Sequence, residues 1–363
     1  MTRNHGSIKI HITMAEKRKP NKTIRDIARL SGFSRSTVSL VLNDSPRISE
    51  TTRKKVMEVM QKVGYQPNVL ARRLAERKSM MIGVIIPQTF HALSDLYFSE
   101  AISGISDVLM NSGYKLMLQM AIPEFKVQKK YVNLFTEKYI DGLLIIGSLM
   151  DEEMVKVLHE LEYPIFLVNS TFEGVSSVIA DNQSGASQAV DHLVRLGHKS
   201  IGIIKGLENV TTGADRSIGF AKAIHRHHLP LREEWVAYGT FSEESGYVCM
   251  QQILGQRHHP TAMFIANDMM AIGAIRAIRQ HGLKVPEDMA VVGGDDIKLA
   301  AYIDPPLTTI RQDMYEIGAL AASELVSMIQ KETYGTPVQK IVPTQLNVRK
   351  SCGFELGGRK LSR

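Results

Sequence analysis

Residues 23–43, TIRDIARLSGFSRSTVSLVLN, combine two short helical patterns of hydrophobic positions with a glycine between them. The apolar residues that share an inner face are Ile24, Ile27 and Ala28 in the first pattern and Val38, Val41 and Leu42 in the second. Gly32 stands where the chain must leave the first helix with φ > 0, which costs glycine nothing. The pattern predicts two short helices joined by a tight turn.

Capping residues support both helices and indicate a third. Thr23 can cap the first helix, with Asp26 at its positive end, and Ser34 can cap the second. Ser49 can cap a third helix over residues 50–63, which Gly64 ends. We interpret the first two helices as a helix-turn-helix, the second of which could enter a DNA major groove. An ordinary αα-hairpin is the alternative.

From residue 80 the pattern changes to strand-length apolar runs separated by helix-period stretches. The runs are residues 81–87, 115–121, 142–148, 164–170, 200–206, 262–268 and 290–296. This alternation predicts an α/β core of doubly wound parallel sheets, and about 270 residues of it indicate two lobes. Ligands bind beyond the carboxyl ends of such strands. The polar residues that end the runs are Asn169, Asn267, Asp268, Asp295 and Asp296.

Positive charge is concentrated at the N-terminal end. Residues 1–80 hold 18 Lys and Arg against 6 Asp and Glu, a net charge of +12. Since the whole chain of 363 residues carries +7, the remaining 283 residues carry −5. A small basic helical head on an acidic body is typical of a module that binds phosphates, so nucleic acid is the expected partner.

A short segment, residues 66–79 (QPNVLARRLAERKS), connects the head to the core. Pro67 disfavours helix before it, and Asn68 can cap about two helical turns, which are marginal alone. The segment is either a linker or a DNA-binding element. In the second case Arg72 and Arg73 are available for phosphates and Leu74 for a wedge between bases in the minor groove.

Other sequence features argue against a membrane or secreted protein, a disulfide framework and a metal site. The apolar runs are too short to span a bilayer and the N-terminus lacks the apolar block of a signal peptide, so we expect a cytoplasmic protein without membrane contact. Cys249 and Cys352 are too few for a disulfide framework or a zinc site. The histidines in HRHH, 225–228, lack an acidic cage, so we predict no metal site and no cofactor beyond a small-molecule effector.

Taken together, these motifs resemble the lac repressor family of bacterial transcription regulators over nearly the whole chain. The segments that carry the resemblance are TIRDIARLSGFSRSTVSLVLN, ISETTRKKV, GYQPNVLARRLA, DGLLI, HLVRLGHKSIGII, DRSIGF, PTAMFIANDMMAIGAIRAI and VVGGDDIKLAAYIDPPLTTIRQD. The resemblance implies a homodimer whose heads bind near-palindromic double-stranded operator DNA. It also implies hinge helices in the minor groove and a core similar to type I periplasmic binding proteins that binds a small effector.

The resemblance assigns DNA contacts residue by residue. The implied DNA-binding residues are Thr23, Ser34, Arg35, Ser36, Thr37, Ser39, Leu40 and Asn43 in the head, and Asn68, Ala71, Arg72, Leu74 and Ala75 in the hinge. Many relatives have an arginine where this chain has Leu40, which can offer only apolar contact. The outer bases of the operator therefore cannot be inferred from relatives.

The resemblance also implies an effector site between the lobes. The implied residues are Asn169, Arg216, Phe241, Asn267 and Asp295, and Tyr97 and Phe98, at the end of the long first-strand loop PQTFHALSDLYF, complete the candidate set. Asn, Asp and Arg side chains suit vicinal hydroxyls, and an aromatic ring suits a sugar C–H face. We therefore expect a sugar or sugar derivative and a repressor of carbohydrate utilisation.

Two alternatives remain for the function. Residues 238–262 look like the purine repressor, which implies a nucleobase effector, although Ser170 replaces the stacking tryptophan of that branch. The remote alternative is an enzyme acting on sugars or nucleotides with a DNA-binding appendage. We expect no catalytic residues, because no nucleophile-base pair, phosphate loop or metal cluster occurs at recognisable spacing.

The expected domain boundaries follow from these segments. We expect a basic extension without a fold over 1–22, the helix-turn-helix domain over 23–66, the hinge over 67–79, the effector-binding core over 80–350 and a tail over 351–363. Within the core, the N-lobe takes about 80–180 and 312–340, and the C-lobe about 181–311 and 341–350.

Overall fold

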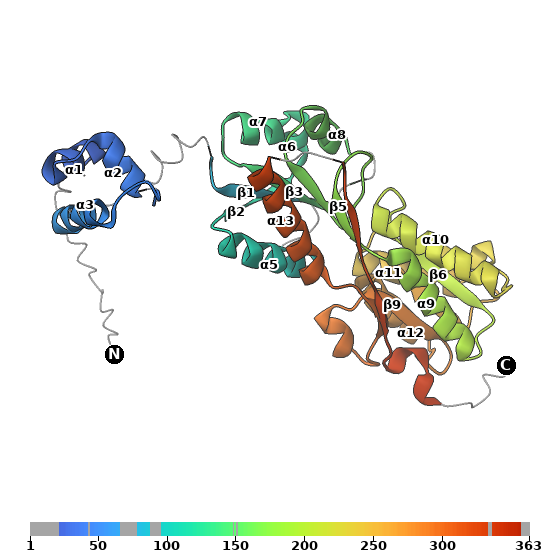
Figure 1. The fold of residues 1–363 in the computed structure, drawn as a ribbon. Coiled ribbons are helices and arrows are strands. Elements are labelled where there is room, and N and C mark those ends of the chain that lie inside the picture. Colours follow the sequence, from blue (N-terminus) through green and yellow to red (C-terminus); the bar gives the residue numbers. More distant parts are fainter. Residues whose placement is uncertain are drawn as a thin grey trace, which may run out of the picture. The chain divides into compact units, whose positions relative to one another are not determined.

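The structure is a computed structural model that describes residues 22–42, 44–65, 78–87, 96–147, 149, 152–332 and 336–356. The chain divides into two compact units, residues 1–77 and 78–363. The described residues of the first unit form three helices, and the second unit contains the two lobes of the core (Figure 1). The predicted contacts at Asn43 and at the five hinge positions Asn68, Ala71, Arg72, Leu74 and Ala75 lie outside the described residues.

The head consists of α1 (Ile24–Ser31), α2 (Arg35–Leu42) and α3 (Glu50–Val63). Thr23 caps α1 as predicted and forms a capping box with Asp26, and Gly32 follows α1 with φ of 77°. Ser49 caps α3, and Gly64 follows it in the left-handed conformation. The core of the head contains the fully buried residues Ile27, Val38 and Val56. The local signals in the sequence therefore predicted these three helices correctly.

The N-lobe is a parallel sheet with strand order β11-β5-β4-β3-β1-β2. Its strands are β1 (Met81–Pro87), β2 (Lys115–Ala121), β3 (Gly142–Ile146), β4 (Ile165–Val168), β5 (Ser177–Ala180) and β11 (Gln339–Val342). Its helices are α5 (Leu96–Asn111), α6 (Pro123–Val127), α7 (Lys130–Thr136), α8 (Glu153–Glu160) and α13 (Met314–Lys331).

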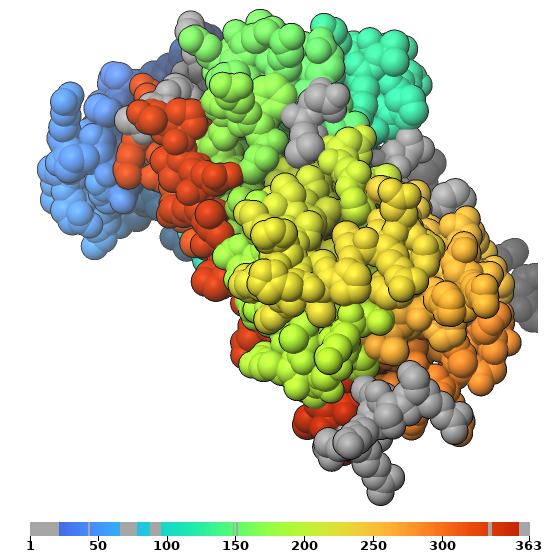
Figure 2. Space-filling model, turned by 90° about the vertical axis from the view of Figure 1, so that its right-hand side faces the viewer, coloured from blue at the N-terminus to red at the C-terminus, as the bar shows by residue number. Residues whose placement is uncertain are grey.

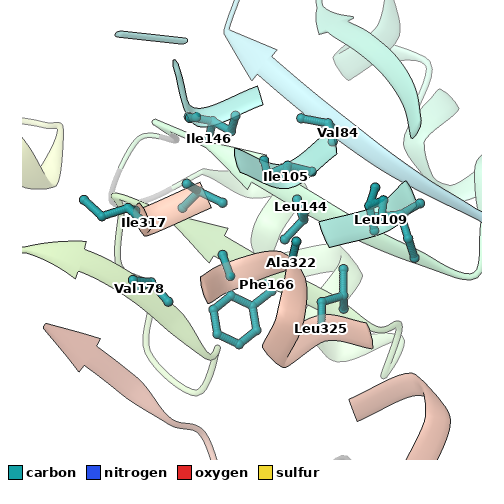
Figure 3. Packing of buried hydrophobic residues seen from close by; sticks show 14 of the residues in the cluster. Val84, Ile105, Leu109, Leu144, Ile146, Phe166, Val178, Ile317, Ala322 and Leu325 are labelled. Carbon is teal, nitrogen blue, oxygen red and sulfur yellow. The ribbon is translucent and has the colours of Figure 1, made fainter. Parts of the chain in front are cut away.

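Alternate strand residues of the N-lobe face opposite layers. Val84 packs in the cluster formed with α5 and α13, whereas Ile85 packs in the cluster formed with α6, α7 and α8. Figure 3 shows the first cluster, with Ile105 of α5 and Leu325 of α13 near Leu144 of the sheet. Helices on both faces bury this sheet, as expected for parallel strands.

The C-lobe has the strand order β12-β10-β9-β8-β6-β7, parallel except for the antiparallel pair β10 and β12. Its strands are β6 (Ile201–Lys205), β7 (Val236–Tyr238), β8 (Ala262–Ile265), β9 (Ala290–Asp295), β10 (Thr308–Arg311) and β12 (Gln345–Asn347). Its helices are α9 (Asn182–Arg195), α10 (Thr211–Arg226), α11 (Glu243–Leu254) and α12 (Asp268–Gln280), with 3-10 turns η1 (Glu233–Trp235), η2 (Lys298–Ala301), η3 (Lys350–Cys352) and η4 (Phe354–Leu356).

The chain passes between the lobes three times. The crossovers lie between β5 and α9, between β10 and α13, and between β11 and β12. Figures 1 and 2 show the last of these, in red, running from one lobe to the other. Three crossovers place Asp181, Gln312 and Thr344 at the junction between the lobes.

The sequence-based boundary between core and tail at residue 351 was wrong. Ser351 and Cys352 are fully buried, and the Ser351 hydroxyl donates to the backbone oxygen of Val291 in β9 at 2.7 Å. The backbone nitrogen of Thr308 donates to the same hydroxyl at 2.8 Å. Residues 350–352 are therefore part of the C-lobe, held by contacts that local composition does not reveal.

No helix in the described part of the chain is long and apolar enough to cross a membrane.

Candidate functional site

The N-terminal end of α2 presents a polar, exposed surface. The Ser34 hydroxyl accepts from the backbone nitrogen of Thr37 at 3.0 Å, which caps the helix, and lies 2.7 Å from the Ser36 hydroxyl. Arg35 and Ser36 are exposed, and Leu40 is 38% exposed on the same helix. The residues predicted to contact DNA bases, Arg35, Ser36 and Leu40, therefore lie outside the core of the head, where the DNA major groove could accept them.

In the head, exposed Lys and Arg side chains supply the positive charge, whereas one partly buried arginine helps to position the helices. Residues 22–65 contain nine Lys and Arg against four Asp and Glu, a net charge of +5, and eight of the nine cations are exposed. The ninth, Arg53 of α3, pairs with Asp44 and donates to the backbone oxygen of Ser45 at 3.1 Å. Arg53 thus ties the segment after α2 to α3.

In the core, Asn169 follows β4 and is fully buried. Its side-chain nitrogen donates to the Tyr97 hydroxyl and to Oε1 of Gln312, both at 2.9 Å. Its side-chain oxygen accepts from the backbone nitrogen of Ala180 at 3.0 Å. Asn169 therefore links the start of α5, the end of β5 and the crossover that precedes α13.

Arg216 of α10 is the centre of a second set of bonds. Its Nε donates to Oδ1 of Asn182 at 2.9 Å, and its NH2 donates to Oδ1 of Asp295 at 2.7 Å. NH1 donates to the backbone oxygen of Ala266, next to Asn267. The Arg216 and Asp295 side chains are 7% and 10% exposed. Because the ion pair is buried, the guanidinium is fixed and its charge is neutralised.

Gln312 joins these two sets. Its Nε2 donates to Oδ1 of Asp295 at 2.7 Å while its Oε1 accepts from Asn169. One side chain on the crossover between the lobes thus connects the N-lobe and C-lobe residues. Sequence reasoning missed Gln312, although its position between a strand and a helix that belong to different lobes could have indicated it.

Phe241 and Asn267 form a neighbouring pair in the C-lobe. Asn267 caps α12 by accepting from the backbone nitrogen of Met270, and its Nδ2 donates to the backbone oxygen of Phe241 at 2.9 Å. The Phe241 ring lies against Gly206, where an added Cβ would come 2.2 Å from the ring. The absence of a side chain at Gly206 therefore leaves room for the Phe241 ring beside the end of β6.

Four of the eleven non-glycine residues that have positive φ in the described part of the chain lie in this region. Asn169, Phe241, Asp295 and Asp296 have φ values of 51°, 66°, 116° and 59°. Non-glycine residues with positive φ cost free energy and persist where surrounding contacts hold them, often at functional sites. Three of these four residues belong to the predicted effector set, and the fourth, Asp296, follows Asp295 and pairs with Arg349 at 2.7 Å.

Asp268 lies beneath this region and is fully buried. Its burial raises its pKa well above the usual range, and the charge of Asp295 raises the pKa further. The Thr309 hydroxyl at 2.5 Å and the backbone nitrogen of Ile297 at 2.9 Å donate to it. Burial and Asp295 thus oppose ionisation of Asp268, the two donors favour it, and the bond from Ile297 holds the turn after Asp295.

A cavity of about 470 Å³ opens beside the network at the junction of the lobes. Tyr97, Asp295 and Gln312 line it, as does Lys298, which bridges to Glu100 of the other lobe at 3.2 Å. Phe98 instead lies in the hydrophobic core, because the next position on α5 turns toward the sheet. The structure thus joins Tyr97, Asn169, Arg216 and Asp295 in one network and assigns Phe98 to packing.

No group of three or more His, Cys, Asp or Glu arranged to hold a metal ion occurs among the residues whose positions are described. In the histidine-rich segment, His227 lies 2.6 Å from Oδ1 of Asp191, which also accepts from Arg226 at 2.6 Å. These contacts connect α10 to α9 on the surface.

Comparison with known proteins identifies both units. Residues 23–68 match the family described as bacterial regulatory proteins, lacI family, and residues 190–352 match the periplasmic binding protein-like domain. The "Probable HTH-type transcriptional repressor ExuR" of Bacillus subtilis is 34% identical over 333 residues, 91% of this chain and 98% of that protein. The chain belongs to the LacI family.

Other LacI-family proteins show similar coverage. The "HTH-type transcriptional repressor PurR" of Haemophilus influenzae is 34% identical over 91% of this chain and 98% of its own length. A solved lac repressor dimer bound to operator and an anti-inducer has a TM-score of 0.78 and 29% identity, over 92% of this chain and 99% of that one. A complex of the regulator CelR with cellobiose has a TM-score of 0.71 and 29% identity, over 91% and 100%.

Membership of the LacI family decides between the two functional classes. The relatives are transcriptional repressors with the same DNA-binding head, so the protein is a transcription regulator and the enzyme alternative is discarded. The resemblance inferred from the motifs and the predicted α/β two-lobed fold are confirmed.

Proposed function

We propose that the protein is a homodimeric repressor of a carbohydrate-utilisation operon in the bacterial cytoplasm, bound at the nucleoid when it occupies its operator. Its affinity for operator DNA responds to a sugar-type effector held between the lobes. The exposed end of α2 reads the major groove, and the hinge residues Asn68 to Ala75 enter the minor groove. Effector and operator are then coupled by a free energy of typically about 1–3 kcal/mol.

The observation that supports a sugar is the buried Arg216–Asp295 pair with Asn169 and Gln312 beside it. Adjacent hydroxyls can donate to a carboxylate and accept from a guanidinium at the same time, so a neutral diol leaves the pair intact. An anion on Arg216 would compete with Asp295 and leave a buried carboxylate without its cation, which is costly. The geometry therefore favours a neutral polyol.

A nucleobase is the second candidate. The Phe241 ring, held beside the end of β6, could stack on a purine, and PurR is among the relatives. Ser170, however, has no ring, so the position where the purine branch has a tryptophan offers no second aromatic face. A ligand screen that includes neutral sugars, sugar acids and purines separates the two candidates.

Two measurements test the proposal. Thermal unfolding with each ligand detects the effector, because a ligand at 100 times its Kd stabilises the folded state by about 2.7 kcal/mol. Arg216→Ala should abolish the shift; an unchanged shift removes that residue from the site. Mobility assays on selected palindromic DNA should show sequence-selective binding that Leu74→Ala weakens. Binding without sequence preference at every salt concentration contradicts the repressor function.

A further inference from the structure

The carboxylate of Asp296 is held by residues from another part of the chain. One of its oxygens, Oδ1, accepts from NH2 of Arg349 at 2.7 Å, and the other, Oδ2, accepts from Nδ2 of Asn347 at 2.6 Å. Asn347 ends β12 and Arg349 lies two residues further along the chain, so both donors follow the last crossover between the lobes. Because β10 lies between β9 and β12 in the sheet, both side chains reach past β10 to the residue that follows β9.

The two donors are themselves fixed at β10. NH1 of Arg349 donates to the backbone oxygen of Leu307 at 2.8 Å, and the Arg349 backbone nitrogen donates to the Thr308 hydroxyl at 2.8 Å. Asn347 pairs with Thr309 in the antiparallel ladder of β10 and β12. Hydrogen bonds to an ionised group are roughly twice as strong as bonds between neutral groups. The carboxylate is therefore bound by two donors whose own positions are set by the sheet.

These bonds support an unfavourable backbone conformation. Asp295 and Asp296 are consecutive residues with φ of 116° and 59°. Non-glycine residues keep such values only where surrounding contacts hold them. The backbone nitrogen of Asp296 donates to the Thr309 hydroxyl at 3.4 Å, a long bond, whereas the carboxylate has two short ones. The direction of the Asp295 side chain therefore depends on how Asp296 is held, as well as on Arg216 and Gln312.

The cavity at the junction of the lobes separates the roles of the two donors. Asp296 and Arg349 line it, whereas Asn347 is not among the described residues that do. An effector in the cavity can contact Arg349 directly, but Asn347 acts on the effector only through Asp296. A substitution of Asn347 is therefore the cleaner probe of an indirect effect.

We propose that Asn347 and Arg349 are positioning residues for effector recognition. By binding Asp296 they set the position of the Asp295 carboxylate, which accepts hydroxyl groups of the sugar. The proposal rests on the sugar-responsive function and deepens it, because the last crossover between the lobes then takes part in recognition. A displaced acceptor weakens the hydrogen bond to the hydroxyl it binds and leaves the bonds to other hydroxyls unchanged.

Deoxy analogues test this indirect role in the full-length protein. Calorimetry gives the Kd of neutral hexoses and pentoses and, for the sugar that binds most tightly, of each monodeoxy analogue. The ratio of analogue Kd to parent Kd measures the bond to each hydroxyl, and Asp295→Asn identifies the ratio that depends on Asp295. We expect Asn347→Ala to weaken the parent sugar about fivefold or more and to lower that same ratio, with no further effect when Asp295→Asn is already present. Arg349→Met should lower the same ratio.

Gln188→Ala is the matched control. The Gln188 amide of α9 donates to the backbone oxygen of Thr344, on the same crossover, at 3.3 Å. Its loss removes an amide bond to the crossover while both bonds to Asp296 remain, so the affinity and every ratio should stay unchanged. Thermal unfolding checks that each variant is folded, and Asn347→Thr, which suits a strand, is the second variant at this position.

The outcomes separate this proposal from the proposed function. If Asn347→Ala changes the parent Kd less than about twofold, weakens the parent and all analogues alike, or adds its full effect to that of Asp295→Asn, the positioning role is wrong and the sugar function stands. If no neutral sugar binds the wild-type protein, both proposals fail.

Discussion

The buried Arg216–Asp295 pair offers the strongest test of how the C-lobe side of the candidate site is held. Arg216→Met keeps the apolar stem and removes the guanidinium. Asp295 then keeps its hydrogen bond from Gln312 but loses its cation, and Asn182 and the Ala266 oxygen each lose a donor. Breaking a buried pair from one side costs about 3–5 kcal/mol. For domains of 150–250 residues this corresponds to a fall in Tm of roughly 6–20 °C.

The assay is thermal and urea unfolding of the full-length protein, followed in the transition of the core. A double-mutant cycle with Asp295→Asn isolates the pair, because removing both charges leaves neither buried alone. We expect the double variant to lose less stability than the sum of the single variants, by about 1–3 kcal/mol. The cycle thus separates the pair from general damage to packing.

A matched control lies on the same helix. Arg226 of α10 pairs with Asp191 at 2.6 Å, but its side chain is 52% exposed. Surface pairs contribute about 0–1 kcal/mol, so Arg226→Met should barely change the unfolding transition. If Arg216→Met costs no more than Arg226→Met, the reasoning that assigns a structural and sensing role to the buried pair is refuted.

Three further outcomes are expected. Gly32→Ala should destabilise the head by about 1–2 kcal/mol in thermal unfolding. An added Cβ would touch no other atom, so the cost comes from the backbone φ of 77°, which is strained for alanine; an unchanged transition contradicts this. Leu40→Arg should change operator preference in mobility assays with stability within about 0.5 kcal/mol; identical preference excludes Leu40 as a reader. Burial, with a smaller contribution from the charge of His192, lowers the pKa of His198 to about 4, below the value of 6.5 for the unfolded chain. The unfolded chain therefore binds the proton first, and His198→Gln should lose less stability than wild type as pH falls from 6.5 toward 4; parallel pH profiles contradict this.

Local patterns were sufficient for the head and the main strands. The helix predicted over residues 50–63 is α3, and the seven predicted apolar runs contain β1, β2, β3, β4, β6, β8 and β9. Caps, glycines with positive φ and runs of apolar residues act within a few residues, so the sequence displays them directly. The parts of the fold that such signals specify are therefore predictable from one sequence.

Strands defined by distant partners were not predicted. The unpredicted strands are β5, β7, β10, β11 and β12, each three or four residues long. β12 contains the polar sequence Gln345–Asn347 and is a strand because Thr309 to Arg311 pair with it. Pairing with a distant segment overrides weak local preference, which a short window cannot detect.

The candidate site also contains residues that local sequence patterns indicate and residues whose role depends on distant partners. Asn169 and Asp295 were recognisable because polar residues follow apolar strands at the edge where ligands bind. Gln312 and Asn182 were missed because each lies next to a crossover, and their role depends on partners 143 and 34 residues away. Phe98 was predicted to bind the effector together with its neighbour Tyr97. In the structure the Phe98 side chain faces the hydrophobic core instead.

The separation of charge between the units explains how one chain can sense a neutral molecule and bind a polyanion. In the cleft, Asp295 pairs with Arg216 and Asp296 pairs with Arg349, while burial favours the uncharged form of Asp268. These pairs leave little net charge to attract phosphates. The cations that can release counterions from DNA are instead exposed on the head. Salt should therefore weaken operator binding steeply and effector binding only slightly, and equal salt dependence of the two affinities would contradict this division.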